Sequence, residues 1–419
     1  MPGFQAPVGT RDILPPESTR WERLIALFAR RAERSGYGLV VSPMFEDIGV
    51  FERVGEATDV VRKEMYDFED KGGRRMALRP EGTASVVRAW VQHRPTLPFK
   101  AWYAAPSFRY ERPQAGRYRQ HHQLGVEALG TDDADLDVEV IALAWGLYGD
   151  VGLGAVRLLL NSLGDATCRP AYLDALRAYL TEHRGELCDE HKARLEANPL
   201  RVLDCKRESC MRVTEGAPRM VDHLCDECAA HFSRVREGLG ELDIPFELAP
   251  RLVRGLDYYT RTTFEFQAPA LESAQNGIGG GGRYDALTEQ LGGPPTPGIG
   301  FGIGIERVLL ACDAEGVFPA PPAAVAVFVV DVTGSVALRL VEELREAGVG
   351  ADRAFDRRSM KAQFKLADRS GARLAVVVGP DELERGIAKL QSLTGDDKEE
   401  EDVKLEELVE RVRARLGPA

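Results

Sequence analysis

The sequence of 419 residues predicts a chain of two or three domains that mix strands and helices, with a helical insertion inside the first. Strand and helix patterns alternate from about residue 19 to residue 164, and they resume at residue 246. Between these regions, Cys168–Asp243 is helical and charged and holds six of the seven cysteines. After the Ala/Pro-rich stretch Phe318–Ala324, strands and helices alternate again, which indicates a separate small α/β domain.

The first domain should begin with an amphipathic helix. Trp21, Leu24 and Phe28 recur at helical spacing, so one side of this helix is expected to be buried. Apolar runs bounded by glycine or charged residues then indicate strands. The expected elements are a helix at Thr19–Arg34, strands at Leu39–Val41 and Val156–Leu160, a strand region at Phe246–Phe266 and a helix at Ile305–Cys312.

The C-terminal region should form its own sheet. Strand and helix patterns alternate along it, which favours a mostly parallel sheet. The acidic run Asp396–Asp402 is expected to be a solvated hairpin or loop. The elements expected here are Val325–Val330, Val336–Glu346, Gly350–Asp352, Met360–Arg369 and Leu374–Val378.

Composition narrows the class of protein. Hydrophobic residues make up 44% of the chain, no apolar run approaches the ~20 residues that span a bilayer, and the N-terminus lacks the pattern of a secretory signal. These features predict a soluble cytoplasmic protein with no membrane partner. The net charge of −12 argues against unspecific coating of nucleic acid, but it leaves a specific contact through a local basic patch open.

Two segments carry charged residues where a sheet core would carry valine or leucine. Phe108–Glu127 and Leu252–Phe266 both set arginines among aromatic and β-branched residues. Alternation along a strand places Gln123 and Glu127 on one face. Buried charge is costly unless it is paired or holds a ligand, so these segments, with the glycine-rich run Gly277–Gly282, predict a polar binding site on a sheet.

These segments resemble the signatures of class II aminoacyl-tRNA synthetases, and of histidyl-tRNA synthetases within that class. Phe108–Glu127 resembles motif 2, and Leu252–Phe266 is similar to the first histidine-specific signature. The match runs in family order from Pro7 to near the C-terminus. Its other parts are Gly36–Met44 (motif 1, with Pro43), Arg79–Thr83 (amino-group-binding loop), Gly277–Asp285 (second histidine signature) and Gly300–Leu309 (motif 3).

The resemblance implies a fold and an activity. It implies an α+β catalytic domain, an antiparallel sheet flanked by helices, with a helical insertion and a C-terminal α/β anticodon-binding domain. The implied enzyme is a histidine–tRNA ligase that forms histidyl-adenylate from L-histidine and ATP with Mg²⁺, releases pyrophosphate, and transfers histidine to the 3′ end of its tRNA. Motif 1 implies a homodimer. The expected boundaries are 1–167 and 246–318 for the catalytic domain, 168–245 for the insertion, 319–325 for the linker and 326–419 for the anticodon-binding domain.

Arginines are expected to carry the activation step. The histidine carboxylate must attack the α-phosphorus of ATP while negative charge spreads over that phosphate, and a guanidinium stays charged and binds phosphate through two donors. The resemblance implies that Arg109 grips the α-phosphate, that Arg117 reaches the outer phosphates and that Arg307 clamps the nucleotide. It implies that Arg254 brings carboxylate and α-phosphate together, in place of a metal-binding carboxylate.

The histidine pocket must satisfy an ammonium, a carboxylate and both imidazole nitrogens. Glu81, Thr83 and Gln123 are the candidates for the ammonium. Glu127 should accept a hydrogen bond from one ring nitrogen and Tyr259 should bond the other. The full predicted histidine set is Glu81, Gly82, Thr83, Arg109, Gln123, Glu127, Arg254, Tyr258 and Tyr259. Core packing is the alternative for the two tyrosines.

Contacts to tRNA are expected in two places. The loop Arg112–Arg119 resembles the one that handles the acceptor end, with Arg112 and Gln114 as candidates. Arg357 and Lys361 are candidates in the anticodon-binding domain, where a solvated helix end is a nearly equal alternative. The glycine run lacks the lysine of a P-loop and a strand–turn–helix context, so we expect it to let substrate approach the backbone closely.

The cysteines of the insertion allow two interpretations. Cys205 and Cys210 form one pair, and Cys225 and Cys228 form a second, a pattern similar to a four-sulfur zinc site. The spacing of the first pair is loose and the family does not generally require zinc. We therefore favour reduced, packed cysteines and no metal.

Two other functions compete with the ligase. One is a non-catalytic relative that regulates ATP phosphoribosyltransferase, but such proteins typically lack the anticodon domain and catalytic arginines, which this sequence keeps. The other is a sensor of uncharged tRNA, which would usually be fused to a kinase, and this sequence has no kinase signature.

Overall fold

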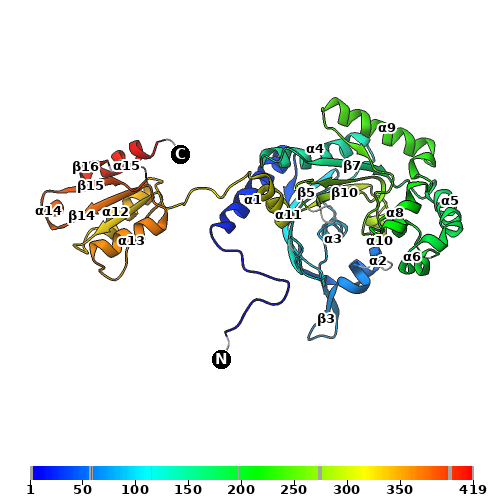
Figure 1. Ribbon diagram of the computed structural model, residues 1–419, viewed down its shortest axis with the longest axis horizontal. Helices are drawn as coiled ribbons and strands as arrows, with labels where there is room; N and C mark the ends of the chain where they lie inside the picture. The colour runs from blue at the N-terminus through cyan, green and yellow to red at the C-terminus, as the bar shows by residue number, and fades with distance from the viewer. Residues whose placement is uncertain are drawn as a thin grey trace. The chain divides into compact units, whose positions relative to one another are not determined.

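The computed structural model describes residues 3–55, 58, 60–114, 116–196, 198–271, 276–394 and 399–417. They form two compact units, Met1–Ala320 and Pro321–Ala419 (Figure 1). Among the described residues, every helix is too short or too polar to cross a membrane.

An eight-stranded sheet forms the centre of the first unit, in the order β1-β5-β6-β11-β10-β9-β7-β8. Its middle pairs are antiparallel, and only the edge pairs β1–β5 and β7–β8 are parallel. This is the antiparallel sheet that the resemblance implied. The strands are β1 (Gly38–Leu39), β5 (Phe99–Phe108), β6 (Gln120–Leu129), β7 (Arg157–Ser162), β8 (Glu247–Leu248), β9 (Thr260–Gln267), β10 (Gly277–Arg283) and β11 (Gly298–Gly304).

Long helices cover one face of this sheet with apolar side chains. They are α1 (Glu17–Arg34), α4 (Ala134–Asp150) and α11 (Ile305–Glu315). The predicted buried side of the first helix is confirmed, because Trp21, Leu24 and Phe28 lie in the main core with Phe264 and Phe301 of the sheet. The expected helix at Ile305–Cys312 is confirmed as most of α11.

The other side of the sheet carries shorter elements around a second core. Helix α3 packs beside α2 and α10, and Trp90 of α3 shares a core with Tyr258, Tyr259 and Tyr284. A three-stranded sheet in the order β2-β4-β3 adjoins them. The bounds are α2 (Gly49–Gly55), α3 (Thr83–His93), α10 (Leu287–Gln290), β2 (Phe45–Asp47), β3 (Tyr66–Glu69) and β4 (Arg75–Leu78).

The insertion is helical, as the sequence predicted. Its last helix, α9, lies along α4, and there the carboxylate of Asp137 holds both His231 Nε2 at 2.8 Å and the buried Arg283 Nη2 at 2.7 Å. Its helices are α5 (Arg169–Glu182), α6 (Asp189–Arg194), α7 (Leu200–Leu203), α8 (Glu208–Glu215) and α9 (Asp226–Glu241).

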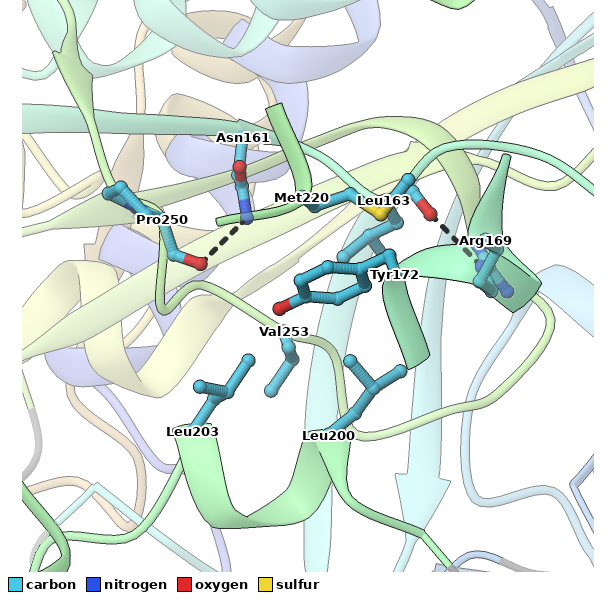
Figure 2. A pocket seen from close by; sticks show the side chains of 9 residues that line it. All are labelled: Asn161, Leu163, Arg169, Tyr172, Leu200, Leu203, Met220, Pro250 and Val253. Carbon is cyan, nitrogen blue, oxygen red and sulfur yellow. Dashed lines mark hydrogen bonds between the residues drawn. The ribbon is translucent and has the colours of Figure 1, made fainter. Parts of the chain in front are cut away.

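A polar joint connects the insertion to the sheet. A small cavity of about 10 Å³ lies at this joint, and Figure 2 shows side chains that line it, among them Tyr172, Met220 and three leucines. Asn161 Nδ2 donates to Pro250 O at 3.3 Å, and Arg169 Nε donates to Leu163 O at 3.0 Å. The hydrogen bond from Arg169 to Leu163 therefore holds the start of α5 beside the end of β7.

The second unit has a mixed sheet, in the order β13-β12-β14-β15-β16. The prediction of a mostly parallel sheet is wrong, because β12 pairs in parallel with β13 and β14 whereas β15 and β16 run antiparallel. The prediction of a solvated hairpin or loop for the acidic run agrees with the described part of it. Residues 400–402 lie in β16, which pairs antiparallel with β15, while 395–398 lie outside the described residues. The elements are β12 (Val327–Asp331), α12 (Ala337–Glu346), β13 (Ala351–Arg353), α13 (Met360–Ser370), β14 (Leu374–Val378), α14 (Pro380–Glu384), β15 (Ile387–Ser392), β16 (Glu400–Lys404) and α15 (Leu408–Leu416).

Candidate active site

A polar cavity of about 130 Å³ lies over the middle of the eight-stranded sheet. Segments far apart in the sequence build it: the start of α3, strands β5, β6, β10 and β11, and the loop before β9. It brings together most of the residues predicted to bind histidine. Its lining is Val60, Glu81, Thr83, Tyr103, Arg109, Gln123, Arg254, Gly255, Leu256, Tyr258, Tyr259, Gly280 and Gly302.

Two glycines, Gly280 and Gly302, form part of the cavity wall. The pairing register places Gly125, Gly302 and Gly280 in one row across three neighbouring strands. Glycine is required here by close approach: a Cβ on Gly125 would lie 2.3 Å from the Tyr103 ring, and one on Gly280 would lie 2.7 Å from Arg254 Nη1. The expectation that the glycine run brings the backbone close to the site therefore agrees with the geometry, although the run itself is a strand.

Glu81 is fixed by the first turn of α3. Its two carboxylate oxygens accept from the backbone N–H groups of Thr83 at 2.6 Å and Ala84 at 2.9 Å, donors that a helix N-terminus leaves unpaired. Burial raises the pKa of the Glu81 carboxyl, and these backbone hydrogen bonds oppose the rise. Gly82, between them, has no room for a side chain because Tyr103 lies 2.5 Å from the position of a Cβ.

Glu127 is fully buried, and the side chain of Thr83 lies between it and the cavity. Its Oε1 accepts from Thr83 Oγ1 at 2.7 Å and from Tyr103 OH at 3.3 Å, and its Oε2 accepts from Tyr284 OH. Desolvation raises the pKa of Glu127 to about 8, although the three hydroxyl donors oppose it. On the neighbouring strands Ala101 and Gly300 leave room for this carboxylate.

The two arginines predicted to be catalytic both face the cavity. Arg109 follows β5 and lines the cavity; its Nε donates to Pro80 O at 3.0 Å, and its Nη1 lies 3.9 Å from Glu111 Oε1. Arg254 lies over Gly280, with Nη1 3.4 Å from Glu265 Oε2 and its guanidinium carbon 5.7 Å from the centre of the Tyr259 ring. Arg254 is therefore held from both sides by groups that stabilise its charge.

Arg117 and Arg307 lie beside this cavity and outside its lining. Arg117 Nε pairs with Glu111 Oε2 at 2.7 Å, and Arg307 Nε donates to Gly277 O. Burial lowers the pKa of Arg307, and the nearby positive charge of Arg117 lowers it further. Two neighbouring positive charges raise the local potential, which attracts anions.

The family models and relatives identify the chain. A family described as Histidyl-tRNA synthetase matches residues 9–308, and one described as Anticodon binding domain matches residues 324–415. This chain belongs to the histidyl-tRNA synthetase family. The Histidine--tRNA ligase of Dehalococcoides mccartyi is 50% identical over 397 residues, covering 93% of this chain and 95% of that protein. The Histidine--tRNA ligase of Rhodococcus erythropolis is 50% identical over 417 residues, covering 98% and 97%.

A solved structure gives the same result. The crystal structure of the apo S. aureus histidyl-tRNA synthetase is 36% identical with a TM-score of 0.82, and the match covers 98% of this chain and 100% of that chain. The predictions of family, class II fold and enzymatic activity are confirmed. The chain activates histidine with ATP and attaches it to tRNA, so the two competing functions are set aside.

The predicted tRNA contacts of this synthetase lie on the surface. Arg112 and Gln114 are exposed in the loop that follows β5, where Gln114 forms an isolated bridge with Arg117. Arg357 and Lys361 are exposed in the second unit, at the turn before α13 and in its first turn. Their exposure leaves all four side chains accessible.

The four cysteines proposed as one zinc site do not meet at one site, so that ligand set is corrected. Cys205 and Cys210 lie with Cys188 and His191, whereas Cys225 and Cys228 lie with Asp165 and Cys168. The sequence spacing suggested the wrong set because the chain folds each pair against a different segment of the insertion.

Three residues of the site were missed by sequence reasoning. Tyr103 lines the cavity, Tyr284 donates to Glu127, and Glu265 pairs with Arg254. Glu265 had a signal, since it stands between Phe264 and Phe266 in a strand. The two tyrosines resemble ordinary core aromatics in the sequence, and only the strand register shows that each faces a buried polar group.

Proposed function

We propose that the cavity binds histidine and that Arg109 and Arg254 act on the α-phosphate of ATP, supplied as its Mg²⁺ complex. Both guanidinium groups line the same small cavity, which is the observation that supports this assignment best. Positive groups that are already in place stabilise the charge that develops on the phosphate during attack by the histidine carboxylate. Arg117 and Arg307 then hold the outer phosphates and the nucleotide, next to the cavity.

The amino group of histidine is assigned to Glu81, Thr83 and Gln123, with Gly82 allowing the close approach. All three side chains line the cavity. Their oxygens are acceptors, which an ammonium with three donors requires. Ser107 Oγ donates to Gln123 Oε1 at 3.2 Å, which supports the orientation of that amide.

The imidazole is assigned to Glu127 and Tyr259, with Tyr258 stacked beside the latter. The two tyrosine rings lie 4.7 Å apart, and both line the cavity. Glu127 lies next to the cavity, since Thr83 and Tyr103, which line it, both donate to its carboxylate. A pocket with buried polar groups on both sides rejects amino acids that lack both ring nitrogens, because those groups would be left unpaired.

The second step transfers histidine to the terminal ribose hydroxyl of tRNA, which attacks the mixed anhydride. Arg112 and Gln114 are proposed to contact the first nucleotides of the acceptor end, and Arg357 and Lys361 the anticodon region. The proposed boundaries are 168–245 for the insertion and 319–325 for the linker before the anticodon-binding domain at 326–419.

We further propose a cytoplasmic homodimer built on the motif 1 segment. Strand β1 is an edge strand, and beyond it Val41 and Met44 are 85% and 52% exposed, while Leu39 within the strand is 57% exposed. An apolar edge of this kind is a surface that a second copy would cover. Analytical ultracentrifugation tests it, and a monomer at micromolar concentration would contradict it.

One assay tests the assignment of substrate and site together. Histidine-dependent exchange of pyrophosphate into ATP, measured across a panel of amino acids, should proceed only with histidine. Equal exchange with an amino acid that lacks an imidazole would contradict the pocket proposed here.

A further inference from the structure

The insertion contains two clusters of metal-ligating side chains that the aminoacylation reaction does not use. The first cluster is Cys188, His191, Cys205 and Cys210, and the second cluster is Asp165, Cys168, Cys225 and Cys228. In each cluster the four ligand atoms lie within 4.8 Å of one another. Tetrahedral zinc with bonds of ~2.3 Å separates its ligand atoms by about 3.8 Å, so small side-chain rotations would close either cluster around an ion.

The first cluster has the ligand chemistry of a structural zinc site. Three thiol sulfurs and one imidazole nitrogen form a Cys₃His set, which is a common structural set for zinc. Cys188 Sγ lies 3.0 Å from His191 Nδ1, and the backbone N–H of Cys188 donates to Cys210 Sγ at 3.3 Å. Backbone donors of this kind stabilise a thiolate that is bound to a metal.

The local fold explains why these four residues meet. Cys188 stands at the N-cap of α6, and His191 follows three residues later on the same side of that helix. Cys205 follows α7, and Cys210 is the third residue of α8. These helices are short, at 6, 4 and 8 residues, and they share a small core, so a metal that links all three would stabilise them.

The second cluster is carried by separate residues at the base of the insertion. Asp165 and Cys168 precede α5, while Cys225 is the N-cap of α9 and Cys228 lies in its first turn. Cys168 Sγ donates to Asp165 Oδ1 at 3.4 Å. Three thiolates and a carboxylate around Zn²⁺ leave a net charge of about −2, and Arg261 Nη2, 3.7 Å from Asp165 Oδ2, is placed to offset part of it.

We propose that the insertion holds two structural zinc ions, one in the Cys₃His cluster and one in the Cys₃Asp cluster. The ion in the Cys₃His cluster would link the helices α6, α7 and α8. The second ties α5 to α9 at the joint with the sheet. Arg169, the first residue of α5, donates to Tyr259 O at 2.6 Å, so the second ion would also steady the backbone of the histidine pocket.

The metal content of the intact protein tests both sites. We expect two zinc ions per chain by inductively coupled plasma mass spectrometry after purification without chelator in reducing buffer. The variant C205S/C210S should lose one ion, and C225S/C228S should lose the other. The matched control is Cys312→Ser, a buried cysteine of α11 outside both clusters, which should lose none.

A second measurement uses the unmodified sequence, so its result does not depend on whether the cysteine variants fold. Apo protein refilled with Co²⁺ should show intense thiolate-to-cobalt absorption and visible bands of tetrahedral cobalt, at two equivalents. Zinc well below one ion per chain together with no cobalt–thiolate absorption would overturn both sites and leave reduced packed cysteines. Loss of metal only in C205S/C210S, with one ion in the native chain, would overturn the second site alone.

Discussion

Replacement of Arg254 by alanine tests the central assignment most directly. The side chain is mostly buried, at 19% exposed, and its guanidinium lies over Gly280, where, within the described part of the chain, it forms one ion pair, with Glu265. Its charge is therefore not needed to satisfy a larger network, and it is available to a substrate in the cavity. Alanine at 254 removes this charge and leaves Arg109 in place.

The expected loss is about 10²–10³ in kcat for pyrophosphate exchange. Loss of one positioned donor to a charge that forms in the transition state typically has this effect, which equals ~2.7–4 kcal/mol. The KM for histidine should rise as well, because Arg254 is also expected to meet the histidine carboxylate, which carries its charge before the attack. Lysine at 254 should restore part of the rate, since it returns a point charge without the fork of two donors.

A second arginine–glutamate pair supplies the control. Arg157 Nε donates to Glu247 Oε1 at 2.6 Å on an exposed edge of the same sheet. Exposed pairs contribute ~0–1 kcal/mol, so Arg157→Ala should leave kcat unchanged. Added guanidinium ion should raise the rate of Arg254→Ala and not that of the control. A folded Arg254→Ala enzyme with the kcat of the Arg157→Ala control would refute the role of this arginine.

Four further predictions concern the pocket, its support and the tRNA. Glu127→Ala should raise the KM for histidine far more than that for ATP in the exchange assay, and equal effects would remove its assignment to the imidazole. Because burial raises the pKa of Glu127 from its ordinary value near 4.5 to about 8, its stabilising contribution is complete below pH 4.5 and is lost as the pH rises towards 8. Relative to Glu127→Gln, the free energy of unfolding of the unmodified chain should therefore fall by up to ~1.4 kcal/mol per pH unit in that window, and parallel urea-derived curves would contradict this. Asp137→Ala should destabilise the first unit by ~1–3 kcal/mol in urea denaturation, because it removes the nearer carboxylate of the buried Arg283 and leaves Asp285, 3.3 Å away, and an unchanged free energy of unfolding would contradict that account. Arg112→Ala should weaken tRNA binding and reduce its salt slope by ~1, and an unchanged slope would show that this arginine meets no phosphate.

Much of the site could be predicted because its residues are polar or charged at strand positions where apolar residues are usual. An arginine, glutamine or glutamate at an alternating position of an apolar strand is a visible departure from the core pattern. Arg109, Gln123 and Arg254 were found in this way, together with the family resemblance, and the cavity brings them together. Tyr103 was not found, because a tyrosine in a strand fits a core position as well as a pocket.

Other parts depend on contacts that the sequence does not encode locally. The zinc ligand set was wrong because Cys188 and His191 reach Cys205 and Cys210 only through the packing of three short helices. In the second unit, the antiparallel pairing of β15 with β14 was not expected, since alternation of strands and helices earlier in that unit favoured parallel pairing. Local patterns give the type of an element more readily than its partner.

The alternation within β11 explains how a sheet can carry a polar cleft without losing its core. Ile299, Phe301 and Ile303 point to the face covered by helices and are almost completely buried, while the glycines between them face the cleft. On the next strand, β6, the residues that face the same cleft are Gln123, Gly125 and Glu127, each paired with a glycine of β11. The helix-covered face thus supplies the apolar burial that stabilises the unit, and the glycines of the opposite face leave room for the polar side chains of Tyr103, Glu127 and Arg254. A polar site of this size is compatible with a stable sheet because side chains alternate between the two faces of a strand. The apolar ones are buried under the helices, and the polar ones lie on the opposite face.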